Sequence, residues 1–277
     1  MKMEFRELTE TKALVVVEDS TPAVMNALRQ TLVSDIPKMA IEYVEYHLGP
    51  IRDQDGREYE SISPLFDEIL SHRLGMVPIP TDLDFFSFRE GCECEGEGCP
   101  KCSIMYVLNK KGPCTVYSGD LEPVGDSSLK IKEDIIPLVK LSEGQSPLIY
   151  ATAVLGTGRE HAKWQVCHGV GYKYYPVIKI NAKKCDRGAS CVRICPRDVF
   201  VEGGKKIEIA DPEACTLCMS CTEECELDAI TVEGDTSKFV LTLETDGSVS
   251  AQHALQYALD LLTEKANSLR DGVSSLG

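Results

Sequence analysis

Apolar and polar positions predict a strand and a helix near each end of the chain. Residues 13–18 (ALVVVE) are apolar and β-branched, as in a buried strand. A helix is predicted directly afterwards, because Thr21 can cap its first turn and apolar positions recur at helical spacing up to Pro37. Residues 238–244 (KFVLTLE) alternate like a strand, and a long amphipathic helix follows the turn at residues 245–248. The two ends of the chain therefore have similar elements.

The long C-terminal helix carries an apolar stripe on one face. The stripe consists of leucines and one alanine at helical spacing: Leu255, Leu259, Leu262, Ala266 and Leu269. Such a stripe is either ordinary core or a face that binds a partner, and a helix at a chain end can serve both purposes. The periodicity leaves both interpretations open.

The middle of the chain predicts a mixed region of helices and strands. A short helix is marked by Ser63 as its cap, Pro64 at its first position and Gly75 just past its end. Residues 79–164 are rich in turns and contain short apolar runs that suggest strands. We therefore predict the α+β fold class.

Length and charge limit what the protein can be. A chain of 277 residues predicts two or three domains. Its 44 acidic and 29 basic residues give a net charge of −15, which repels phosphate and argues against strong direct nucleic-acid binding. No apolar run in the sequence approaches the roughly 18 residues that a membrane span requires. Neither nucleic acid nor a membrane is expected as a direct partner.

The 13 cysteines indicate metal sites rather than disulfides. Residues 1–10 carry charges where a signal peptide needs an apolar core, so we expect a cytoplasmic protein with reduced thiols. In a reducing compartment, cysteines clustered at short and regular spacing are better explained by metal binding.

One stretch of the sequence repeats at a spacing of 30 residues. Four positions correspond in each half: Cys185, Gly188, Cys191 and Cys195 align with Cys215, Cys218, Cys221 and Cys225. Each half predicts a cysteine loop, a short helix and a strand. The second half reads C-x2-C-x2-C-x3-C and the first ends in Cys195-Pro196, and together they resemble the two-cluster ferredoxins of the bacterial type.

The ferredoxin resemblance implies how the cysteines are shared between clusters. In that pattern the fourth cysteine of each run binds the other cluster. The implied complete set for a [4Fe-4S] cluster is Cys195, Cys215, Cys218 and Cys221. Soft thiolates at close spacing suit the neighbouring irons of such a cluster. The alternative, that these are merely buried thiols, is disfavoured because polar neighbours such as Thr216 and Ser220 do not make an apolar core.

The second set is one ligand short. Its members are Cys185, Cys191 and Cys225. Gly188 stands where a fourth cysteine is expected. Three thiolates could hold a [3Fe-4S] cluster, or a [4Fe-4S] cluster completed by water or by a carboxylate such as Asp186, or the site could be empty.

Another group of cysteines lies in a loop rich in glycine and glutamate. Its members are Cys92, Cys94, Cys99 and Cys102. Four close thiolates predict a structural zinc site, because no coordination position remains for water or substrate. The alternative is a loop of vestigial or redox-active thiols, since only one residue separates the first pair.

The sequence predicts no catalytic residues. The stretch Gly156-Thr157-Gly158 before His161 lacks the spacing of a phosphate-binding loop, and the sequence has no dinucleotide fingerprint. No Ser/His/Asp arrangement and no Asp-rich metal triplet of a polymerase active site can be found in it. Chemistry on a substrate by this chain alone is therefore not expected.

Four segments that together span nearly the whole chain carry a family resemblance. They are residues 22–49 (PAVMNALRQTLVSDIPKMAIEYVEYHLG), 66–80 (FDEILSHRLGMVPIP), 117–164 and 243–248 (LETDGS). In this order they are similar to the alpha-subunit family of multisubunit DNA-directed RNA polymerases, and most of all to its archaeal, D-type branch.

The resemblance implies a fold of three domains. Residues 1–41 and 235–277 would form a dimerization domain, residues 42–177 an inserted α+β domain that carries the cysteine-rich loop 92–102, and residues 178–234 an inserted ferredoxin-like domain of βαββαβ order. This arrangement agrees with the similar elements at the two chain ends.

The resemblance also implies a function and its partners. A member of this family is a non-catalytic platform that forms a heterodimer with the smaller subunit L, and the large catalytic subunits assemble on the pair. The residues implied in the subunit L interface are Leu28, Leu32, Leu255, Leu259 and Leu262.

The iron–sulfur segment leaves its role and a rival function open. A cluster could hold together a segment too small to build its own core, or its oxidation could lower polymerase assembly. The rival is a ferredoxin-like electron-transfer subunit of an oxidoreductase. The incomplete second cysteine set and the lack of a flavin or nicotinamide motif in the sequence argue against that rival.

Overall fold

The computed structural model describes residues 1–52, 56–204 and 206–275, which form two compact units. The first unit comprises Met1–Leu8, Ala13–Arg29 and Val170–Leu243. The second comprises Thr9–Lys12, Gln30–Gly169 and Glu244–Gly277. Both helices and sheets contribute to the chain, so the predicted α+β class is confirmed.

The first unit is built on a four-stranded sheet. In spatial order its strands are β1 (Lys2–Leu8), β2 (Lys12–Glu18), β14 (Ile230–Glu244) and β11 (Gly171–Ile180). The strand predicted from the run ALVVVE is β2, in which Val15, Val16 and Val17 are almost completely buried. β1 lies at the edge and leaves most of its charged side chains exposed. The side chains of an edge strand can stay in contact with water. Its sequence therefore lacks the apolar alternation that predicts a strand.

The predicted helices at the two chain ends are confirmed as α1 (Pro22–Ser34) and α5 (Ala251–Ser274). The backbone N–H of Val24 donates to Thr21 Oγ1 at 3.4 Å. Ser250 caps α5, because its hydroxyl accepts a hydrogen bond from the backbone N–H of His253 at 3.2 Å. No helix in the described part of the chain, α5 included, is long and apolar enough to cross a membrane.

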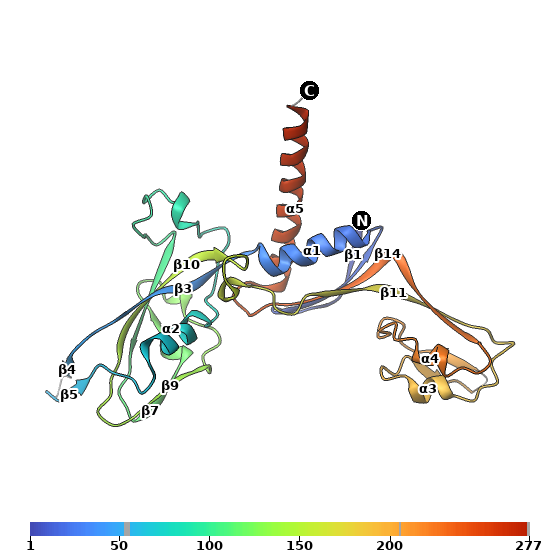
Figure 1. Ribbon diagram of the computed structural model, residues 1–277, viewed down its shortest axis with the longest axis horizontal. Coiled ribbons are helices and arrows are strands. Elements are labelled where there is room, and N and C mark those ends of the chain that lie inside the picture. The colour runs from blue at the N-terminus through green and yellow to red at the C-terminus, as the bar shows by residue number, and fades with distance from the viewer. Residues whose placement is uncertain (53–55, 205, 276–277) are drawn as a thin grey trace. The chain divides into compact units, whose positions relative to one another are not determined.

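Strands β11 and β14 continue past the sheet and carry the ferredoxin-like segment (Figure 1). Between them lie α3 (Ser190–Ile194), β12 (Phe200–Glu202), β13 (Ile207–Ile209) and α4 (Ser220–Glu223). The resulting order, β11-α3-β12-β13-α4-β14, is the predicted βαββαβ arrangement. β14 is a single strand of 15 residues, so the return from the cysteine repeat and the predicted C-terminal strand are continuous.

The second unit surrounds a large apolar core. Its main sheet has the order β3 (Pro37–Tyr46), β10 (Leu148–Thr157), β6 (Ser103–Asn109) and β8 (Glu122–Pro123). Two small sheets join β4 (Pro50–Arg52) to β5 (Glu58–Glu60), and β7 (Cys114–Tyr117) to β9 (Pro137–Leu141). Short 3-10 helices lie at Arg89–Gly91, Ser118–Asp120, Ser127–Leu129 and Ala162–Trp164. Alternate residues of β6, Ile104, Tyr106 and Leu108, point into the core, as strand periodicity requires.

The short helix α2 (Asp67–Gly75) packs on β3 within the second unit. It begins later than the sequence predicts. Ser63 does not cap it, because its hydroxyl donates instead to the carbonyl oxygen of Leu65 at 2.8 Å. Phe66, with extended backbone, is the residue before the first turn. The predicted end near Gly75 is confirmed.

Candidate metal centres

The backbone of the cysteine segment repeats at the same interval as its sequence. Three residues in each half have left-handed backbone with positive φ, and each lies 30 positions from its counterpart. The pairs are Arg187 and Leu217, Ala189 and Met219, and Asp198 and Asp228. A left-handed residue other than glycine costs about 1 kcal/mol, so six of them in a short segment indicate a functional constraint on its backbone.

The structure brings together the cysteines of the complete set. Four thiols from both repeats line one pocket: Cys195, Cys215, Cys218 and Cys221. Apolar side chains, Val199, Phe200 and Val232 among them, form part of the same wall. Burial, and next the charges of the three other cysteines, raise the pKa of Cys221 to about 11. Four thiolates that line one pocket repel one another, and bound cations would remove that repulsion.

One thiol of the complete set is more accessible than the others. Cys218 is exposed, and hydrogen bonds from the side chain and backbone of Ser220 lower its pKa. Ser220 is the first residue of α4, so the turn that starts this helix also favours the thiolate form of the ligand.

The three cysteines of the incomplete set line a second pocket. They are Cys185, Cys191 and Cys225. Burial raises the pKa of Cys191, and the charges of the other two thiols act in the same direction. The empty volume of this pocket, including its part open to solvent, is about 770 Å³, against about 330 Å³ for the first. The incomplete set therefore lies in the wider and more open of the two pockets.

A carboxylate lies beside the missing fourth thiol. A side chain built on Gly188 would have its Cβ 3.3 and 3.4 Å from the two carboxylate oxygens of Asp186. The backbone N–H of Gly188 donates to Asp186 Oδ1 at 2.9 Å and holds the carboxylate there. An oxygen ligand is therefore available where the repeat lacks a sulfur.

Hydrogen bonds tie the cysteine segment to the sheet of the first unit. Lys173 on β11 donates to the carbonyl oxygen of Cys215 at 2.7 Å and also to that of Glu213. Arg6 on β1 forms a two-point ion pair with the Glu213 carboxylate, with N–O distances of 2.9 and 3.0 Å. The residues that lead into the complete set are thus fixed by two different strands. Sequence reasoning missed this link, because nothing local marks Lys173 or Arg6 as partners of residue 213.

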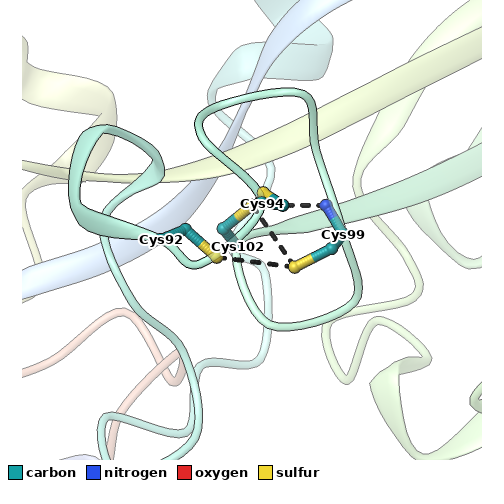
Figure 2. Close-up of side chains that lie close together, drawn as sticks. All are labelled: Cys92, Cys94, Cys99 and Cys102. Atoms are coloured by element: carbon teal, nitrogen blue, oxygen red, sulfur yellow. Dashed lines mark hydrogen bonds between the residues drawn. The ribbon is translucent and has the colours of Figure 1, made fainter.

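The third group of cysteines, in the loop, forms a compact cluster in the second unit. The thiols of Cys92, Cys94, Cys99 and Cys102 all lie within 4.8 Å of one another (Figure 2). The Sγ–Sγ distances are 3.5 Å for Cys92 and Cys99, 3.5 Å for Cys94 and Cys102, and 3.8 Å for Cys99 and Cys102. Zn–S bonds of about 2.3 Å place the sulfurs of a tetrahedral site about 3.8 Å apart. The spacing fits zinc.

The thiols of this cluster differ in the direction of their pKa shifts. A hydrogen bond from the backbone of Cys94, and next one from Cys99, lower the pKa of Cys92 to about 6, whereas burial raises the pKa of Cys102 to about 12. Arg89 braces the loop by donating to the carbonyl oxygens of Gly96 at 2.6 Å and Glu97 at 3.2 Å. The thiols are therefore preorganised by the loop's own hydrogen bonds.

The leucines predicted at a partner interface differ in exposure. Leu28, Leu32 and Leu255 are 0 to 3 % exposed and already buried within this chain. Leu259 and Leu262 are half-buried. Further along α5, Leu269 and Val273 are 70 % and 62 % exposed. The apolar surface that α5 leaves exposed thus lies nearer its C-terminal end than the predicted set.

A buried carboxylate fixes α5 within the second unit. Asp35 accepts hydrogen bonds from Lys265 on α5 at 2.5 Å and from Arg159 at 2.6 Å, while its side chain is 6 % exposed. Burial alone would raise the pKa of Asp35, but these hydrogen bonds and one from Ser34 outweigh it and hold the pKa well below its usual value. Sequence reasoning missed this carboxylate because its partners come from distant segments.

Two family models match adjacent parts of the chain. The model described as the RNA polymerase Rpb3/RpoA insert domain matches residues 57–170, and the one described as a 4Fe-4S dicluster domain matches residues 177–231. Together they define the class as an alpha-type RNA polymerase subunit with an iron–sulfur segment, and the predicted iron–sulfur character is confirmed.

Curated relatives are similar over their full length. DNA-directed RNA polymerase subunit Rpo3 of Picrophilus torridus is 40% identical over 272 residues, which cover 98% of this chain and 99% of the relative. The Rpo3 of Thermoplasma volcanium is 40% identical over 99% of this chain and 100% of its own length, and that of Methanothermobacter thermautotrophicus is 39% identical over 96% of each. The chain belongs to the Rpo3 family of DNA-directed RNA polymerase subunits. The predicted family is confirmed.

Proposed function

We propose that this chain is the non-catalytic assembly platform of its DNA-directed RNA polymerase, pairing with the smaller subunit L before the large catalytic subunits bind. The full-length similarity to Rpo3 relatives carries this proposal. The rival electron-transfer role is not favoured, because the relatives match the whole chain rather than the cysteine segment alone.

The second half of α5 supplies the pairing surface in this proposal. Its apolar positions recur three or four residues apart along one face: Leu259, Leu262, Ala266, Leu269 and Val273. Exposure along this face rises toward the helix end, where Leu269 and Val273 are largely uncovered. An apolar helix face that its own chain leaves open is suited to packing against a partner helix.

Charge substitutions on the two faces of α5 test the pairing. Leu269→Glu with Val273→Glu places two carboxylates in the apolar contact, so we expect the affinity for subunit L to fall at least about tenfold. Asn267→Glu with Ser268→Glu adds the same charge at exposed positions of the same helix outside the stripe and serves as the control. The measurement is titration of labelled subunit L into the purified chain. Equal affinity of both variants would contradict the proposal.

We further propose that the complete set binds a [4Fe-4S] cluster and the incomplete set a second cluster. The second would be [3Fe-4S] on three thiolates, or [4Fe-4S] with the Asp186 carboxylate as fourth ligand. The shared pocket of the four thiols supports the first assignment, and the carboxylate beside Gly188 supports the second. When bound, such clusters supply cross-links and redox chemistry, and we favour cross-linking as the main role.

Iron content and spectroscopy of anaerobically purified chain test the cluster assignment. Each cluster contributes about three or four irons, so wild-type chain should carry about seven or eight. Cys218→Ser and Cys185→Ser should each remove the signal of one cluster in Mössbauer spectra, and different signals should be lost. About four irons in the wild type, unchanged in Cys185→Ser, would show that the incomplete set is empty.

The loop cysteines are proposed to hold a structural zinc ion through four thiolates. Their mutual distances match a tetrahedral sulfur site, and Arg89 holds the loop backbone independently of any ion. A closed site of four thiolates leaves no position for a substrate, so the role would be to fix the loop.

The proposed domain division is that of the family resemblance. Residues 1–41 and 235–277 form the dimerization domain, residues 42–177 the inserted α+β domain, and residues 178–234 the ferredoxin-like domain. The bounds of the two family models, 57–170 and 177–231, support the two insertions.

A further inference from the structure

A broad groove lies on the second unit between the sheet and the cysteine loop. Strands β3, β6 and β10 form its floor, through residues such as Tyr43, Met105 and Thr152. Phe88 and the loop residues that follow it form one wall. The groove has an empty volume of about 1830 Å³, including its part open to solvent. It is therefore large enough for a stretch of polypeptide rather than a single side chain.

The groove exposes large apolar side chains on its floor and on its wall. Tyr43, Phe88 and Met105 are 52 %, 42 % and 44 % exposed, and all three line it. On the opposite face of the same sheet, Ile104 and Tyr106 are buried in the core. A sheet with one face on the core is ordinarily polar on the other, so the exposed apolar side chains that line the groove on this outer face indicate a binding surface.

Carboxylates surround this apolar floor. Five glutamates line the groove: Glu42, Glu45, Glu90, Glu97 and Glu160. Glu42 is paired with Lys163. Within the described residues, the carboxylates of Glu45, Glu90 and Glu97 form no ion pair. The groove therefore has an excess of negative charge that the chain itself does not neutralise.

Among the described residues, the one basic side chain that lines the groove, Arg89, is already engaged by groups of the groove itself. Arg89 donates to the carbonyl oxygens of Gly96 and Glu97, and its guanidinium lies over the Tyr43 ring, 5.5 Å from the ring centroid. It thereby fastens the wall to the floor. This contact gives the groove a fixed side that does not depend on a metal ion in the loop.

We propose that this groove binds a Lys- and Arg-rich segment of another polymerase subunit, one that also carries apolar side chains. Cations would meet the unpaired carboxylates at the rim, while apolar side chains would cover Tyr43, Phe88 and Met105. Nucleic acid is the wrong chemistry for this surface, because the glutamates repel its phosphates. The surface is separate from the pairing face of α5 and extends the platform function to a second partner contact.

Photocrosslinking in the intact polymerase tests the groove. A benzophenone amino acid at position 105 is introduced in the full chain, and polymerase is purified through another subunit. Co-purification of the substituted chain is scored first, because its failure would bear on the platform function rather than on the groove. After irradiation, mass spectrometry identifies the crosslinked peptide. The expected product is a segment of another subunit with net positive charge.

Charge variants sharpen the same experiment. Glu45→Lys with Glu97→Lys should lower the crosslink yield at least about fivefold, and Glu45→Gln with Glu97→Gln should lower it less. Glu133→Lys with Glu143→Lys makes the same change in net charge at exposed positions that do not line the groove, and should leave the yield unchanged. If the lysine variant does not assemble, the glutamine variant alone decides.

Several outcomes would overturn the proposal. These are a crosslink to nucleic acid, a crosslink to an acidic or uncharged segment, or no crosslink from position 105 in assembled polymerase. An unchanged yield in the variants of residues 45 and 97 would overturn it equally.

Discussion

The ferredoxin-like segment and the second unit use cysteine in opposite ways. In the segment cysteines form part of the core: Cys191, Cys215 and Cys221 are among the buried members of its apolar cluster, and three further thiols pack against it. In the second unit the core consists of aliphatic and aromatic side chains, such as Met39, Leu108 and Ile149, and the four loop cysteines are not part of it.

This difference indicates what a bound metal would do in the ferredoxin-like segment and in the second unit. A segment of about 50 residues buries too little apolar surface to fold without help, so ligand bonds must replace part of its core. The second unit already has a core, so a metal ion in its loop can order only the loop. Three predictions test this contrast.

The largest effect is expected from removing a cluster ligand. Cys221→Ser deletes a buried thiol of the complete set, and local stability of residues 181–229 should fall by about 4 kcal/mol or more because metal binding and folding are coupled in small domains. Hydrogen exchange under anaerobic conditions measures this loss, while protection of β6 should persist. Cys114→Ser, at a half-buried cysteine outside the three sets, is the control. Unchanged protection of the segment in Cys221→Ser would contradict a metal-dependent core.

An intermediate effect is expected at the buried carboxylate of the second unit. Asp35→Asn removes the acceptor charge for Arg159 and Lys265, and we expect a loss of about 1–3 kcal/mol, less than for a fully buried pair because both basic side chains are partly exposed. The folded-state pKa of Asp35 lies below its ordinary value near 3.9, so its stabilisation is present above that value and is lost as the pH falls below it.

The difference in unfolding free energy between wild type and Asp35→Asn should therefore shrink as the pH falls from about 5 to 3. Urea unfolding followed through the second unit's tryptophan, Trp164, measures it. Asp84→Asn changes the same group at an exposed position and should show little difference at any pH. A difference that grows toward low pH would contradict the sign of the shift.

The smallest effect on overall stability is expected from the cysteine loop. Cys94→Ser should weaken metal binding and abolish exchange protection of residues 92–102, yet change the unfolding free energy of the second unit by only about 1 kcal/mol or less. Mass spectrometry measures the zinc content, and hydrogen exchange measures the protection of residues 92–102. A loss comparable to that of Cys221→Ser would mean that this core, too, depends on metal.

Much of the fold follows from the sequence because its signals are local. The β-branched run of β2, the cap of α1 and the 30-residue repeat each depend on residues close together in the chain. The cross-sharing of cysteines requires the ferredoxin resemblance, since spacing alone does not say which thiols meet. In the structure Cys195 lines the same pocket as Cys215, although 20 positions separate them.

What the sequence does not predict depends on distant partners or on weak local preference. β1 escapes prediction because an exposed, charged edge strand has no apolar alternation. In the sequence Asp35 resembles any other polar residue, because its partners Arg159 and Lys265 lie far away along the chain. The stripe of α5 is evident from its spacing, but only tertiary packing decides that Leu255 is buried and Leu269 exposed.

Because the two repeats exchange their fourth cysteine, the order of synthesis determines when each cluster can bind. In the proposed ligand sets, Cys195 must wait for Cys215, Cys218 and Cys221, and the first repeat must wait for Cys225, so the first half cannot bind a cluster until the second half has left the ribosome. The stretch of about 50 residues from Cys225 to residue 275 contains β14 and α5 and takes about 3–10 s to translate. In the proposed assembly, all seven cluster cysteines therefore leave the ribosome before the pairing helix α5 does, so cluster insertion can precede pairing with subunit L.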